Sequence, residues 1–257
     1  PTTKVICIFL EGVEDARKLM QIAKEVAKEK TILIYKVGKT EVAARAAFSH
    51  TGSLAGSYEL YQTAFAQAGI LEVIEPSELV DAAKAISILP PAKGEKVALV
   101  THTAGPGLVI TEVLERYGIG LSVLSEETKK RVLEAMPVNI IVQNPCDLLG
   151  VAYVVPELYG IVGRILLEDR DVDALIMVYI PSFQQEIRLP AKELIEITRA
   201  TNKPVIAALV SPSILPIEEK YDLEQNGVAV YRTPERAAKA MANYIKYWKL
   251  RRNRFSV

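Results

Sequence analysis

The chain has 257 residues and a formal net charge of zero at pH 7, because 31 lysines and arginines balance 31 aspartates and glutamates. Without a basic excess, the composition gives no electrostatic basis for nucleic-acid binding, and the basic end at Arg251, Arg252 and Arg254 is expected to be a solvated tail rather than a membrane anchor. The apolar runs are only strand-sized and the two cysteines, Cys7 and Cys146, are far apart, so we expect a cytoplasmic protein without membrane spans, disulfides or bound metal.

The first ninety residues alternate between short apolar runs and segments with helical periodicity. The predicted strands are 5–10, 31–35 and 70–74. The predicted helices are 14–30, 57–68 and 77–89, the last with Ser77 as its cap. Residues 91–95 have the composition of a linker and separate two predicted domains, 1–90 and 96–257.

The second half continues the same alternation. Its predicted strands are 97–100, 121–124, 174–180, 205–210 and 228–231. Its predicted helices are 107–117, 126–136, 156–167, 191–200, 217–226 and 234–248. Continuously apolar strands between helices are typical of parallel sheets that are covered on both faces. We therefore predict an α/β protein with two three-layer domains of unequal size.

Both histidines of the chain stand shortly before a glycine-containing helix start. His50 is followed by Gly52, Ser53, Ala55 and Gly56, and His102 by Gly105, Pro106 and Gly107. A helix start exposes unpaired N–H groups and the positive end of the helix dipole, which favour an anion, and glycine lets the backbone approach a phosphate closely. A histidine beside such a site could be phosphorylated on a ring nitrogen. Tight turns in both loops, with a structural His102, would explain the same residues.

A long segment around His50 resembles a known family. Residues 36–57, KVGKTEVAARAAFSHTGSLAGS, are similar to the phosphohistidine segment of the nucleoside-diphosphate-forming acyl-CoA synthetases, which include ADP-forming acetyl-CoA synthetase and, more distantly, succinyl-CoA synthetase. The similarity continues through 64–70 (AFAQAGI), 101–107 (THTAGPG) and 144–147 (NPCD). It therefore covers essentially the whole chain.

The resemblance assigns roles to individual residues. In that family an acyl-CoA and phosphate give an acyl phosphate, which phosphorylates the histidine, and the phosphohistidine passes its phosphate to ADP. The matching nucleophile is His50, and Glu11 matches the carboxylate that orients it. Such a carboxylate fixes the ring tautomer and stabilises the charge that develops on phosphorylation. Without the resemblance, Glu11 would be taken as a solvated loop residue or a cap.

The phosphate-binding residues are implied in the same way. Around the phosphoryl group the family match places Gly52, Ser53, Leu54 and Ala55 from the first loop and Gly105, Pro106 and Gly107 from the second. Asn144 and Asp147 match a nearby family motif with a supporting role. The sequence departs from the family at His102 and Ala104, where an asparagine and a glycine are usual.

The resemblance further implies that both domains are flavodoxin-like and that the His50 loop, flanked by Gly52 and Gly56, is mobile. The family's CoA-binding Rossmann domain and ATP-grasp portion have no counterpart in this sequence, which also begins without methionine and is expected to be a fragment or one subunit of a split enzyme. No cofactor is expected on the chain alone; CoA, ADP or ATP and magnesium are implied through the missing parts. The expected partners are the ATP-grasp and Rossmann domains and phosphate or acyl phosphate, in a homo- or hetero-oligomer.

The sequence thus predicts the phosphohistidine-carrying part of an acid–thiol ligase that forms ADP or GDP. One alternative is a non-catalytic binding or regulatory module that senses a phosphorylated or acyl-CoA metabolite through the two helix starts. Another is a regulatory domain of a protein lysine acetyltransferase, which uses the same scaffold, although such a domain would not need the nucleophile His50.

Overall fold

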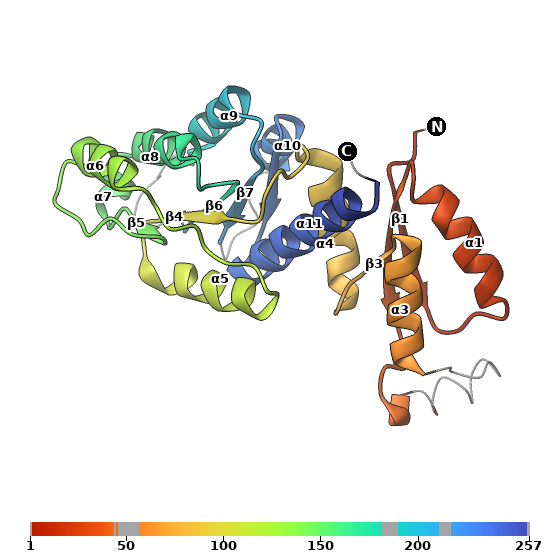
Figure 1. The fold of residues 1–257 in the computed structure, drawn as a ribbon. Helices are drawn as coiled ribbons and strands as arrows, with labels where there is room; N and C mark the ends of the chain where they lie inside the picture. The colour runs from red at the N-terminus through yellow and green to blue at the C-terminus, as the bar shows by residue number, and fades with distance from the viewer. Residues whose placement is uncertain (1, 44, 46–56, 181–189, 211–216, 256–257) are drawn as a thin grey trace. The chain divides into compact units, whose positions relative to one another are not determined.

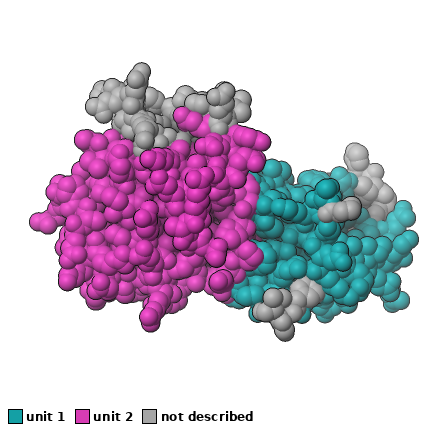
Figure 2. All heavy atoms as spheres, turned by 90° about the horizontal axis from the view of Figure 1, so that it is seen from above, with its two compact units in different colours: residues 1–87, 246–257 teal, residues 88–245 magenta. Residues whose placement is uncertain are grey.

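The computed structural model describes residues 2–43, 45, 57–180, 190–210 and 217–255. Its strands form two parallel sheets, and the chain divides into two compact units, Pro1–Ser87 with Lys246–Val257 and Ile88–Ile245 (Figures 1 and 2). The predicted α/β class with two flavodoxin-like, parallel-sheet parts is confirmed. The unit division groups the last twelve residues with the first unit, while the domain boundaries 1–90 and 96–257 stay a prediction.

The first unit is built on a three-stranded sheet in the order β1-β2-β3. The strands are β1 (Val5–Leu10), β2 (Thr31–Lys36) and β3 (Leu71–Glu72), and the helices are α1 (Ala16–Val26), α3 (Tyr58–Ala68), α4 (Pro76–Ile88) and the last turns of α11 (Pro234–Phe255). Alternate residues of β2 enter two cores: Ile32 and Ile34 pack with α1 and α3, whereas Leu33 packs with α4 and α11. Burial on both faces explains why this strand is continuously apolar.

Three details of the first unit differ from the prediction. The strand expected over 70–74 is reduced to the two residues of β3, and α4 begins at Pro76, so Ser77 lies inside the helix and is not its cap. Proline suits a first helical turn because its missing N–H would have no partner there. Cys7 stands in an apolar run, where a cysteine is expected to be a small buried residue, but it is exposed.

The expectation of a solvated basic tail is wrong. Helix α11 continues to Phe255, seven residues beyond the predicted end. The Arg251 guanidinium donates to the backbone oxygens of Ala27 and Lys28, at 3.4 and 3.0 Å, and the Arg254 guanidinium donates to that of Gln67. These carbonyls lie at the C-terminal ends of α1 and α3, where a cation satisfies free oxygens and the negative end of the helix dipole.

The second unit is built on a five-stranded sheet in the order β5-β4-β6-β7-β8. Its strands are β4 (Val97–Thr101), β5 (Cys146–Asp147), β6 (Ala174–Tyr179), β7 (Val205–Leu209) and β8 (Val228–Tyr231), and its helices are α5 (Ala104–Arg116), α6 (Glu126–Ala135), α7 (Val151–Val154), α8 (Glu157–Glu168), α9 (Ala191–Ala200), α10 (Ile217–Gln225) and the first part of α11. Figure 1 shows α5 and α11 on one face of this sheet and α8 and α9 on the other. Every residue of β4, β6, β7 and β8 is buried, as expected for a covered parallel sheet.

Two elements of the second unit depart from the prediction. The strand expected over 121–124 contributes only a bridge between Leu121 and Val97. The side chain of Asn144 adds to this short backbone pairing, because its nitrogen donates to the backbone oxygens of Val97 and Ser122 at 2.8 and 2.9 Å. The helix expected from residue 107 begins at Ala104, so its glycines lie within the first turn. None of the helices in the described ranges has both the length and the apolar composition needed to cross a membrane.

Candidate functional site

The predicted site residues fall in three places along the chain. His50, Gly52, Ser53, Leu54 and Ala55, together with the proposed mobility of their loop, lie outside the described residues and stay predictions. Glu11 belongs to the first unit, and the glycine-containing start of α5 belongs to the second.

Glu11 directly follows β1 and has an exposed side chain. Its place at the carboxyl end of a parallel strand is the edge at which open α/β sheets bind ligands. Two hydrogen bonds to backbone oxygens hold the main chain there. The Val37 N–H donates to the backbone oxygen of Leu10 at 2.9 Å, and the Lys36 ammonium donates to the backbone oxygen of Glu11 at 2.8 Å. The main chain that carries the Glu11 carboxylate is therefore held in place on both sides of its Cα atom.

Lys36 was not identified from the sequence. It ends β2 and is only 2% exposed, although lysine is rarely buried without partners. Its ammonium also donates to the Val37 oxygen and lies 4.9 Å from the centroid of the Tyr61 ring, a cation–π distance. Burial lowers the pKa of Lys36, and the carboxylates of Glu72 and Glu11 oppose that shift. The signal available in the sequence was a lysine directly after a continuously apolar strand.

A second lysine lies near the same edge of the sheet. The Lys39 ammonium is 3.4 Å from a Glu72 carboxylate oxygen and 4.9 Å from the centroid of the Tyr35 ring. The same Glu72 oxygen accepts a hydrogen bond from the Tyr58 hydroxyl at 2.7 Å. Burial and the Glu72 contact raise the pKa of Tyr58, so it stays a neutral donor. Glu72 therefore contacts both Lys39, which precedes residues 46–56, and Tyr58, which follows them.

The start of α5 has the character of an anion site. The N-cap residue, Thr103, makes no side-chain capping bond within the described structure. The N–H groups of the first turn are therefore not used by a side-chain cap. A Cβ on Gly105 would meet no atom within 4 Å, whereas one on Gly107 would lie 3.4 Å from Pro145 and from Thr101. Gly105 thus leaves the helix start open, and Gly107 allows close packing. Pro106 contributes no N–H and fits the first turn sterically.

His102 lies in an aromatic core rather than on an open surface. It is 4% exposed, and its Nδ1 is hydrogen-bonded to the Tyr159 hydroxyl, which in turn donates to the Val178 oxygen at 2.8 Å. Its ring is 4.3 Å from that of Tyr153, centroid to centroid. Because Tyr159 uses its proton on Val178, Nδ1 must carry the proton shared with Tyr159. Burial lowers the pKa of His102, against the opposing charge of Asp147, so the ring is neutral at pH 7. These contacts favour the structural role over a phosphate ligand.

Asn144 and Asp147 both bond to the backbone. The Asn144 oxygen accepts from the Leu99 N–H at 2.9 Å, in addition to the two bonds that its nitrogen donates to backbone oxygens. An Asp147 oxygen accepts from the Leu149 N–H at 2.8 Å, and Leu149 has a positive φ of 57°. Both side chains therefore shape the backbone at the end of β4 and β5.

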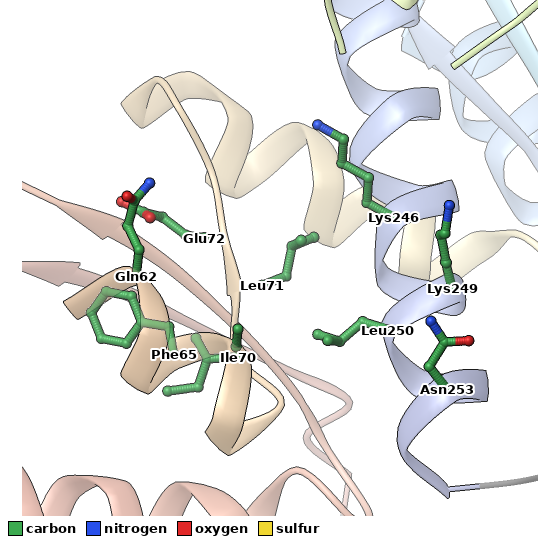
Figure 3. A pocket seen from close by; sticks show the side chains of 10 residues that line it. Gln62, Phe65, Ile70, Leu71, Glu72, Lys246, Lys249, Leu250 and Asn253 are labelled. Atoms are coloured by element: carbon green, nitrogen blue, oxygen red, sulfur yellow. The ribbon is translucent and has the colours of Figure 1, made fainter. Parts of the chain in front are cut away.

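Two further features bear on ligand binding: clusters of metal-ligating side chains, and a groove in the first unit. Across the ranges that the structure describes, no group of three or more histidine, cysteine, aspartate or glutamate side chains is arranged to hold a metal. A groove of about 400 Å³ lies in the first unit between α3, β3 and the end of α11 (Figure 3). Apolar Phe65, Ile70, Leu71 and Leu250 line it together with Gln62, Ala66, Glu72, Lys246, Lys249 and Asn253. None of the predicted site residues belongs to this groove.

Comparisons with known proteins give a consistent result. The family model described as "Succinyl-CoA ligase like flavodoxin domain" matches residues 1–86. The chain is 36% identical over 256 residues to "Acetate--CoA ligase [ADP-forming] I subunit alpha" of Pyrococcus furiosus, covering 96% of this chain and 54% of the relative. It is 33% identical over 249 residues to "Acetate--CoA ligase [ADP-forming] I" of Archaeoglobus fulgidus, covering 97% of this chain and 35% of the relative.

A solved structure agrees with these relatives. The dinucleotide-forming acetyl-coenzyme A synthetase 1 of Ca. Korarchaeum cryptofilum, in complex with phosphate and ADP, superposes with a TM-score of 0.84 at 32% identity. The match covers all of this chain and 56% of that one. The chain therefore spans between about a third and somewhat more than half of the length of these relatives.

Proposed function

We propose that this chain, which is similar over nearly its whole length to ADP-forming acetate–CoA ligases and matches a succinyl-CoA-ligase-like flavodoxin domain over residues 1–86, is the phosphohistidine-carrying component of such an acid–thiol ligase. The observation that carries the proposal is the match along nearly the whole chain to relatives named as ADP-forming acetate–CoA ligases. His50 stands in the segment that resembles the family's phosphohistidine segment.

The proposed chemistry has three balanced steps. Acyl-CoA and phosphate give an acyl phosphate and free CoA. A ring nitrogen of neutral His50 attacks the phosphorus, the bond from phosphorus to the acyl oxygen breaks, and the carboxylate leaves. The phosphoryl group then passes from His50 to a terminal oxygen of ADP and gives ATP. The first and third steps need CoA and nucleotide sites, which we assign to a Rossmann domain and an ATP-grasp partner.

Three groups of residues serve the histidine step. The Glu11 carboxylate accepts the N–H of the far ring nitrogen, which fixes the tautomer and stabilises the positive charge that develops as the phosphorus–nitrogen bond forms. By the family resemblance, we assign the backbone amides of Gly52, Ser53, Leu54 and Ala55 to the phosphoryl oxygens. The open start of α5 offers further N–H donors at Gly105 and Gly107, with Pro106 between them, and a favourable dipole.

The magnesium that accompanies the nucleotide is proposed to lie outside this chain. The described residues contain no ligand cluster that fits it, so no step of the chain's own chemistry is placed on a metal. Of the carboxylates at this edge of the first unit's sheet, Glu72 already binds Tyr58 and Lys39.

Phosphorylation of the purified chain with ³²P-labelled acetyl phosphate tests the proposal. We expect an acid-labile, base-stable label in the unmodified chain and in His102→Asn, and no label in His50→Ala. Circular dichroism establishes that each variant is folded. A folded unmodified chain that takes no label, or a His50→Ala variant that takes as much, would contradict the proposal and favour a non-catalytic binding module.

A further inference from the structure

Lys36 joins three elements of the first unit through one buried ammonium group. The group donates to the Glu11 oxygen after β1, donates to the Val37 oxygen after β2, and lies over the Tyr61 ring on α3. A buried ammonium is costly unless acceptors surround it, so these contacts hold it in one place. With the side chain 2% exposed, the ammonium has little room to move toward solvent.

This contact constrains the part of the chain that carries Glu11. On one side of the Glu11 Cα atom, the Leu10 backbone oxygen accepts from the Val37 N–H at 2.9 Å. On the other, the Glu11 oxygen accepts from Lys36 at 2.8 Å. Because both carbonyls are held, the direction of the Glu11 Cα–Cβ bond is fixed, while the side chain beyond Cβ is exposed.

We propose that Lys36 is a positioning residue for Glu11, and that it sets the direction from which the Glu11 carboxylate meets the histidine ring. This inference rests on the proposed phosphotransfer function. It assigns Lys36 no contact with the phosphoryl group: the residue acts through the Glu11 main chain. Small displacements of a catalytic group slow a reaction strongly, by about a hundredfold for an error of about 1 Å.

A matched control is available in the second unit. The Lys203 ammonium also donates to two backbone oxygens, those of Leu167 and Asp169, at 2.6 and 2.9 Å. Burial lowers the pKa of Lys203 as it does that of Lys36. Lys203→Met therefore removes the same kind of contact from a place that has no part in the proposed chemistry.

The test is a double-mutant cycle on the rate of label incorporation from ³²P-acetyl phosphate, with thermal unfolding followed in parallel. It compares the unmodified chain, Lys36→Met, Glu11→Gln, the double variant and Lys203→Met. We expect Lys36→Met to slow labelling by about tenfold or more and Lys203→Met to leave the rate unchanged. In the Glu11→Gln background, Lys36→Met should cause little further slowing, because the carboxylate it positions is already absent. Lys36→Arg, which keeps a charged donor, should recover part of the rate.

Each other outcome overturns the inference. A Lys36→Met rate equal to that of the unmodified chain removes the positioning role, and equal slowing with and without the Glu11 carboxylate shows a general structural effect. If Lys36→Met does not fold, Lys36→Gln takes its place in the same cycle. An unmodified chain that takes no label overturns the proposed function itself, and this inference with it, whereas the first two results leave phosphotransfer intact.

Discussion

The side-chain oxygen of Asn144 accepts a hydrogen bond from the backbone N–H of Leu99 at 2.9 Å, inside a fully buried strand. The amide nitrogen of the same side chain donates to Val97 and Ser122. Asn144 thereby supplies the hydrogen bonds that a neighbouring strand would give to β4, whose carboxyl end leads to the start of α5.

Replacing Asn144 by alanine should destabilise the chain. The Leu99 N–H would be left buried without its partner, which costs about 1–3 kcal/mol in the free energy of unfolding. Urea unfolding measures the loss, and Asn202→Ala, at an exposed asparagine, should change the free energy by less than about 0.5 kcal/mol. Equal stability of Asn144→Ala and the unmodified chain would mean that the bonds to β4 contribute nothing.

Gly105→Ala should separate stability from activity. The added methyl group meets no atom within 4 Å, and alanine favours a helix over glycine, so the free energy of unfolding should rise by up to about 1 kcal/mol. The same methyl group covers the open helix start, so phosphoryl transfer to His50 should slow by about tenfold, or about 1.4 kcal/mol.

Gly107→Ala is the comparison for that prediction. Its methyl group would contact Pro145 and Thr101 at 3.4 Å, so it should gain less stability than Gly105→Ala or lose some. A Gly105→Ala chain with unchanged labelling kinetics would remove the α5 start from the phosphate site.

Glu11→Gln should lower the labelling rate by about a hundredfold or more while leaving the fold unchanged. The substituted side chain is exposed, and the Lys36 bond goes to the Glu11 backbone oxygen, which the variant keeps. The free energy of unfolding should therefore change by less than about 0.5 kcal/mol. Labelling kinetics measure the rate, and urea unfolding measures the free energy. A labelling rate equal to that of the unmodified chain would exclude an orienting role for this carboxylate.

His102 should make stability depend on pH in a defined direction. Burial lowers the pKa of the folded-state ring below its ordinary 6.5, so the unfolded chain binds the proton more readily than the folded one. The contribution of neutral His102 is then complete above about pH 6.5 and is lost as the pH falls through that value toward the lowered pKa. The difference in unfolding free energy between the unmodified chain and His102→Asn should shrink from pH 7.5 to pH 5.5. A difference that grows on acidification would mean that the folded state prefers the charged ring.

The sequence was sufficient for the elements whose side chains face apolar surroundings on both sides. The runs at Val97–Thr101 and Ala174–Tyr179 are buried throughout, so their hydrophobicity alone located them. It was insufficient where a side chain takes the place of secondary structure, as Asn144 does beside β4. No periodicity in a sequence reports such a replacement.

The residues of the candidate site also differ in how far the sequence predicts them. Glu11 and the α5 glycines could be predicted because they match segments of a known family, and their roles stay predictions. Lys36 was missed because a lysine at the end of a strand is ordinarily solvated, and only the tertiary structure shows its acceptor at Glu11, directly after β1, and its aromatic contact on α3. The aromatic environment of His102 is likewise assembled from Tyr153 and Tyr159, which are far from it in sequence.

The most direct test of the phosphate-carrier role follows the label onward from His50. The ³²P-labelled chain, freed of acetyl phosphate, is mixed with ADP and a separately expressed ATP-grasp subunit of the same family, and the products are separated by chromatography. We predict that label leaves the protein and appears in ATP in equal amount, and that omitting either ADP or the partner leaves the label on the chain. Release of the label only as inorganic phosphate, at a rate independent of ADP and partner, would contradict it.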